Sequence, residues 1–179
     1  MSYSDMLDFG RHYRLTLSQV VFRDPDYFFW AYEGGVLASH GYGSRAAGIY
    51  ERATHIRIPR MGPEPWVAEY AVRGGRLWGV EVVPASQYRD FSAPRLPWLD
   101  LSYARRVCGG KDKTGAELIV RAVKLAWYGD PSERMDRKKC DDFFKSDEHF
   151  VLDAGGVEPN TRASPAAGAG GGPGVKGTG

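Results

Sequence analysis

The sequence predicts an α+β protein: a small hairpin-plus-helix module packs on an antiparallel sheet, which is covered by one long buried helix and a short C-terminal helix. Two strand-like runs flank Gly74-Gly75, an apolar run after Thr114 has helical periodicity, and an aromatic helix follows Asp24. The expected organisation is a module over residues 1–35, a connector over 36–53, an α+β core over 54–152 and a disordered Gly/Ala/Pro tail over 153–179.

The module is expected to begin with short extended pieces at 7–11 and 14–17, which can pair as a hairpin. A helix follows, because Asp24 suits its N-cap and Pro25 its first position, where the missing N–H would be unpaired anyway. Gly34 is expected to end the helix in the left-handed region. Aromatic side chains occupy nearly every side of this helix, so the connector or the core must cover part of it.

The sheet is predicted from one strong hairpin, whose strands are 66–72 and 77–83. Two central glycines allow the positive φ of a type I′ turn, and in that register Tyr70 faces Gly79. Both faces are largely apolar, which is typical of a central element. The hairpin is therefore expected to recruit a strand near 54–58 and another near 99–103. Two segments that connect these elements are expected to be irregular: a loosely ordered connector at 34–48 and a crossing loop at 91–98.

The long helix is predicted to start at a capping box, Thr114 to Glu117, and to end before Gly129. Its polar residues form one narrow stripe, so the rest is expected to be buried, including Leu125 and Trp127. A last helix at 136–145 is expected to point Cys140, Phe143 and Phe144 inward.

Composition and motifs exclude several classes of protein. No apolar run is long enough to span a membrane and the N-terminus lacks a secretory pattern, so we expect a cytoplasmic protein without a membrane partner. Cys108 and Cys140 are too few for a disulfide framework, and the histidines lack metal-ligand spacing. No nucleophile-elbow, zinc-protease or phosphate-loop motif occurs, so we expect no catalytic residue, metal or cofactor.

One segment resembles a known family. Residues 9–35 read FGRHYRLTLSQVVFRDPDYFFWAYEGG, and this pattern is similar to the small domain at the C-terminus of exonuclease X-like nucleases. The resemblance implies an accessory module rather than an enzyme, because no segment resembles the catalytic domain of those nucleases. Arg14 stands where the family has a second glycine, and since Arg adopts positive φ only at a cost, the turn is expected to differ.

Basic residues cluster although the net charge is only +2. Residues 101–139 hold ten bases and five acids, a local charge of +5, and the acids that follow make the next stretch negative. A solvated face is the simpler explanation of such a run, and a phosphate-binding patch is the alternative. The candidate nucleic-acid-binding residues are Arg11, His12, Arg14, Arg105, Arg106, Arg137, Lys138 and Lys139.

The leading hypothesis is therefore a non-catalytic, nucleic-acid-associated accessory protein that binds DNA or RNA. The alternative is a protein-protein interaction adaptor or oligomerising module that uses its aromatic surface. A third hypothesis, an unrecognised hydrolase, would use a cysteine or the carboxylates near residues 141–148.

Overall fold

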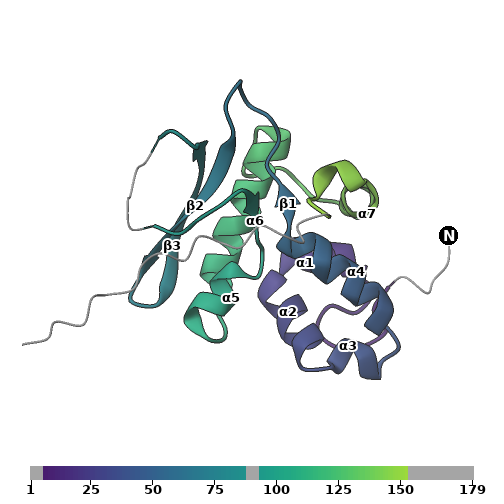
Figure 1. The fold of residues 1–179 in the computed structure, drawn as a ribbon. Helices are drawn as coiled ribbons and strands as arrows, with labels where there is room; N and C mark the ends of the chain where they lie inside the picture. The colour runs from purple at the N-terminus through teal and green to yellow at the C-terminus, as the bar shows by residue number, and fades with distance from the viewer. Residues whose placement is uncertain (1–5, 88–92, 153–179) are drawn as a thin grey trace, which may run out of the picture.

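The computed structural model describes residues 6–87 and 93–152, and it confirms the α+β class (Figure 1). The helices of the N-terminal third form one group, beside which α7 lies, while the long hairpin lies on the other side of α6 (Figure 1). The predicted tail, 153–179, lies outside the described residues. One apolar cluster runs through both groups and includes Phe28, Tyr70, Ile119 and Phe143.

The predicted N-terminal hairpin is reduced to one antiparallel bridge, between Met6 and Thr16. The N–H of Leu7 donates to the Leu15 carbonyl, and the N–H of Arg14 donates to the Leu7 carbonyl, both at 2.8 Å. The second predicted strand is short because helix α1 (Leu17–Arg23) begins at once. Its capping box, Thr16 with Gln19, is visible in the sequence and was missed there.

Helix α2 (Pro25–Glu33) confirms the prediction at its start and corrects it at its end. Asp24 ends α1 and accepts the Tyr27 N–H as the N-cap of α2. Gly34 has φ −79°, whereas the left-handed residue is the next one, Gly35, at φ 72°. Gly35 then opens α3 (Val36–Ser39), so the chain turns directly into another helix.

The expectation of a loosely ordered connector was wrong, because α3 and α4 (Gly43–Thr54) occupy it. Ala46 and Ala53 are fully buried, so their small side chains let the helix approach its neighbours closely. Tyr50 stacks on Tyr32 at 4.5 Å between ring centroids and meets Phe29 edge-on. The connector therefore covers the aromatic helix α2, one of the two possibilities that the sequence left open.

The central hairpin forms as predicted from β2 (Trp66–Arg73) and β3 (Arg76–Pro84), with φ 56° at Gly74 and 72° at Gly75. Beyond the turn, the pairing register of the two strands differs from the predicted one. A β-bulge places Ala71 opposite Gly79, so Tyr70 faces Val80 and not Gly79. Trp78 is the extra residue of the bulge and is 67% exposed.

The strands that join the hairpin are not the predicted ones. β1 (Ile56–Arg57) and β5 (Trp98–Leu99) pair with each other in a separate sheet, while β4 (Arg95–Leu96), from the expected crossing loop, pairs with β2. The sheet order is β3-β2-β4.

Helices α5 (Tyr103–Cys108) and α6 (Lys113–Tyr128) pack on β3. The N-cap of α6 is Asp112 and not Thr114: its Oδ1 accepts the Gly115 N–H at 3.0 Å and its Oδ2 accepts the Leu77 N–H at 3.3 Å. The N–H of Asp112 donates to Asp26 Oδ1 at 3.1 Å. Helix α6 approaches strand β3 closely at Gly115. A Cβ at this position would lie only 2.9 Å from the Leu77 Cβ, so the absence of a side chain permits the approach.

The C-terminal helix α7 (Arg137–Lys145) is confirmed, with Asp136 as its N-cap and Cys140, Phe143 and Phe144 buried. A short 3₁₀ helix follows at Asp147–His149. Thr16 Oγ1 donates to Asp141 Oδ1 at 2.9 Å, which ties α7 to the start of α1.

Burial along α6 corrects the expected core list and gives a stability test. Ile119 is fully buried, whereas Leu125 is 54% exposed. Ile119→Ala should lower the free energy of unfolding by about 2–5 kcal/mol, and Leu125→Ala by less than about 1 kcal/mol. Denaturant titrations of both variants measure the difference, and equal losses would contradict the described orientation of α6.

The Asp112 junction gives a second test. Asp112→Ala removes a helix cap and leaves the Leu77 N–H unpaired, so it should cost about 2–4 kcal/mol of unfolding free energy. Asp136→Ala removes only an exposed cap and should cost about 1 kcal/mol. If chemical denaturation shows the same loss for both, Asp112 acts as a cap alone.

Candidate nucleic-acid interface

The N-terminal turn is organised by the buried carboxylate of Asp24. Its Oδ2 lies 2.6 Å from a terminal guanidinium nitrogen of Arg11 and 3.1 Å from His12 Nε2, while its Oδ1 accepts the Tyr27 N–H. The His12 side chain is buried and held by this contact. The Arg11 and His12 side chains of the predicted basic cluster therefore differ. The Arg11 guanidinium is half-exposed, whereas the His12 ring is buried and stabilises the turn through Asp24.

Tyr27 forms one wall beside that turn. The Arg11 guanidinium lies 4.7 Å from its ring centroid, and the His12 ring meets it edge-on at 4.7 Å. A Cβ on Gly10 would lie 2.8 Å from Tyr27 Oη, and Gly10 has φ 69°, so both space and backbone conformation require glycine. The Tyr27 ring therefore lies in contact with Arg11 and His12 and close to Gly10.

Trp30 follows Tyr27 by one helical turn, with 5.5 Å between their ring centroids. It is 47% exposed, whereas Phe28 and Phe29 on the same helix are buried. Tyr27 and Trp30 line a groove of about 510 Å³, the other lining residues being Arg11, Asp26, Arg105, Gly110 and Lys111.

Arg105 reaches this groove from α5. Its Nε lies 2.7 Å from Glu33 Oε2, and a terminal nitrogen lies 3.7 Å from Asp26 Oδ1. These contacts fasten α5 to α2 and leave Arg105 at the edge of the groove. Lys111 is exposed, and no acidic side chain of residues 6–87 and 93–152 forms an ion pair with it. Cations from the N-terminal turn and from the end of α5 with the loop after it therefore meet at one groove.

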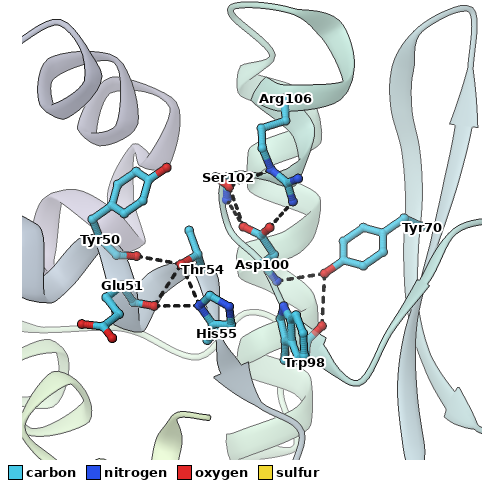
Figure 2. Close-up of polar contacts among 9 residues, drawn as sticks. All are labelled: Tyr50, Glu51, Thr54, His55, Tyr70, Trp98, Asp100, Ser102 and Arg106. Carbon is cyan, nitrogen blue, oxygen red and sulfur yellow. Dashed lines mark hydrogen bonds and ion pairs between the residues drawn. The ribbon is translucent and has the colours of Figure 1, made fainter. Parts of the chain in front are cut away.

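Arg106 does not line that groove; its side chain is 56% exposed and pairs with a buried carboxylate (Figure 2). Its guanidinium pairs with Asp100 Oδ2, and its Nε donates to Ser102 Oγ at 3.2 Å. Asp100 Oδ1 accepts the N–H and the hydroxyl of Ser102, while the Asp100 N–H donates to Tyr70 Oη at 2.9 Å. Burial, and secondarily the Asp100 charge, raise the pKa of Tyr70 well above its ordinary value. The network joins α5 to the sheet.

A second set of contacts in Figure 2 closes the end of α4. Thr54 Oγ1 donates to the carbonyls of Tyr50 and Glu51, and His55 Nδ1 lies 3.2 Å from the Glu51 carbonyl. The His55 ring packs on Trp98 at 5.0 Å. These polar groups satisfy the last turn of the helix and bring no general acid or base to the groove.

The three bases of α7 do not line the groove of Arg11 and Arg105. Arg137 lies 3.6 Å from Asp141 and Lys138 lies 2.5 Å from Asp142, while Lys139 pairs with Glu133. The hydrogen bond with Lys138 lowers the pKa of Asp142 and raises that of Lys138. The i,i+4 spacing that produces two of these pairs is readable in the sequence.

Arg14, the last predicted site residue, lies at a strained position of the N-terminal turn. It has φ 66°, so it adopts the left-handed conformation although it is not a glycine. That conformation costs roughly 1–2 kcal/mol in an L-residue. The Arg14 side chain is exposed and lies over the Tyr13 ring at 5.2 Å.

The hydrolase hypothesis would use a cysteine or the carboxylates near residues 141–148. Cys108 Sγ donates to the Gly110 carbonyl at 3.0 Å. Burial, followed by the charges of Asp141 and Asp136, raises the pKa of the Cys140 thiol to about 12. Within the described residues there is no group of three or more acidic, His or Cys side chains that could hold a metal ion. Nor is any helix there long and apolar enough for a membrane crossing.

Comparisons with known proteins matched no family model, curated sequence or solved structure to this chain. The resemblance over residues 9–35 therefore remains an expectation. Sequence analysis missed Tyr27, Trp30 and Lys111 as site residues. The i,i+3 spacing of the two aromatics was a usable signal, whereas the proximity of Lys111 to them depends on tertiary structure.

The two thiols should differ in reactivity. Only a thiolate reacts with iodoacetamide, so Cys108 should be alkylated first at pH 8 and Cys140 only after unfolding. Mass spectrometry of the native and the denatured protein measures both sites. Rapid native labelling of Cys140 would show that α7 is not packed as described.

Proposed function

We propose that this protein is a non-catalytic, nucleic-acid-associated accessory protein that contacts phosphates at the groove of Arg11, Arg105 and Lys111. One observation carries the proposal: the fold brings the Arg11 cation of the N-terminal turn together with Arg105 and Lys111 at one groove beside an exposed tryptophan. Lys and Arg at a groove supply the sequence-independent part of nucleic-acid affinity. A cytoplasmic location belongs to the proposal, supported by two cysteines that remain free thiols.

The charge balance at the groove supports weak, salt-sensitive binding. Arg11 and Arg105 each have carboxylate partners, so part of their charge is compensated within the fold. Lys111 has no such partner among the described side chains, which makes it the cation most available to a phosphate. The expected affinity therefore depends strongly on Lys111.

The buried carboxylates support a non-catalytic role. Asp24, Asp26, Asp100 and Asp112 all accept backbone N–H groups at junctions between elements. Carboxylates used in this way stabilise the fold, and their oxygens are committed to fixed donors.

A protein-interaction role is the second candidate, and one observation favours it. The bulge of β3 exposes Trp78, with the Arg73 guanidinium 5.3 Å from its ring centroid. Tryptophan and arginine are enriched at the centres of protein interfaces. An adaptor or oligomerising surface would therefore include the hairpin tip rather than the groove.

Charge reversal distinguishes the proposed groove from general attraction. Lys111→Glu should weaken oligonucleotide binding and reduce the slope of log affinity against log salt by about 0.7–0.9, the value for one lost phosphate contact. Lys138→Glu changes the net charge equally, but that lysine lies outside the groove and is already paired with Asp142. Its effect should be smaller. Fluorescence anisotropy at two or more salt concentrations measures both variants.

Three outcomes of that experiment would contradict the groove. Equal losses in the two variants would indicate attraction by net charge alone. A larger loss in Lys138→Glu would move the interface to α7. No binding by the wild type at low salt would remove nucleic acid as the partner and favour the protein-interaction role.

A further inference from the structure

We infer that the groove takes an unpaired nucleic-acid strand, with one base stacked on Trp30 and the flanking phosphates at Lys111 and Arg11. This inference rests on the proposed function and specifies its ligand class. The shared chemistry is that of single-stranded DNA and RNA, which both offer an aromatic base and a phosphodiester.

The first argument is the exposure of Trp30. Trp30 is 47% exposed and lines the groove, while the buried Phe28 and Phe29 on the same helix take part in the core. Tyr27 packs beside the indole and is itself held by Arg11, His12 and the close approach of Gly10. An aromatic ring placed in this way needs little ordering before a base can stack on it.

The second argument concerns which parts of a nucleic acid expose the face of a base. In a duplex the faces are stacked on one another, and the grooves offer only base edges. A tryptophan face can therefore be used only by an unpaired or extruded base. The groove is an open depression of about 510 Å³, a volume in the range of small-molecule pockets, so it can receive one nucleotide.

The third argument is the distribution of charge within the groove. Asp26 is buried at its lining, with Oδ1 accepting the Asp112 N–H and Arg105 nearby. A carboxylate in that place repels phosphate, whereas Lys111 and Arg11 at the exposed edge attract it. A strand is therefore expected to bind with its phosphates outside and one base directed inward.

The experiment compares strand types on the full chain. Fluorescently labelled DNA and RNA single strands of about twelve nucleotides, and the matching DNA duplex, are titrated by anisotropy at low salt. The single strands should bind at least about tenfold more tightly than the duplex. A preference for RNA over DNA would identify contacts with the 2′-hydroxyl, and equal affinities would place recognition in the shared base and phosphate.

Variants then test the stacking residue. Trp30→Ala should weaken single-strand binding about tenfold, and Trp30→Phe should restore most of it because a ring remains. Trp78→Ala removes another exposed indole, outside the groove, and should change nothing. Thermal melts establish that each variant is folded, and the wild-type comparison of single strand with duplex does not depend on any variant.

The outcomes separate the two proposals. Equal binding of duplex and single strand, or unchanged binding by a folded Trp30→Ala variant, would overturn the single-strand inference. If Lys111→Glu still weakened binding in that case, the proposed nucleic-acid role would stand. Absence of binding to all three probes would overturn the proposed function itself.

Discussion

Asp112 connects three elements of the fold through its carboxylate and its backbone N–H, and the position of the groove depends on these contacts. One oxygen caps α6 and the other accepts a backbone N–H from β3, while the Asp112 N–H binds Asp26 at the start of α2. A buried carboxylate is costly unless it is well hydrogen-bonded, so these donors restrict where the three elements can lie. Gly115 permits the approach, because a side chain there would meet both Asp112 and Leu77. The position of Lys111, one residue earlier, follows from the same constraint.

Two other buried aspartates repeat this arrangement. Asp24 lies between α1 and α2 and also holds Arg11 and His12, while Asp100 lies between β5 and α5 and holds Arg106. In each case the carboxylate accepts a hydrogen bond from a nearby backbone N–H and forms an ion pair with a cationic side chain elsewhere in the chain. Charge-assisted hydrogen bonds of this kind are stronger than neutral ones and specify geometry. They fix the relative positions of the helices, which the non-directional contacts of the apolar cluster do not specify.

The same pairing decides which cations remain available to a ligand. The bases of α7 are compensated by Asp141, Asp142 and Glu133, so the strongest basic run in the sequence becomes a set of ion pairs. Exposed ion pairs contribute little to stability, but they lower the local positive potential. The groove lies elsewhere, where Lys111 is exposed and the aromatic residues Tyr27 and Trp30 are held by the N-terminal turn.

The sequence by itself determined the elements whose signals are local. The Gly74-Gly75 turn, the Asp24-Pro25 start of α2, and the inward residues of α7 depend on backbone conformation and periodicity over a few residues. Only the tertiary structure decided the partners of β1 and β5, the bulge that exposes Trp78, and the helical state of residues 43–54. Strand pairing and register are set by contacts between distant segments, and a helix of 12 residues with glycines at positions 43 and 48 is marginal alone and is stabilised by packing against its neighbours. The groove belongs to the second group, since Trp30 and Lys111 approach each other through packing that no local pattern encodes.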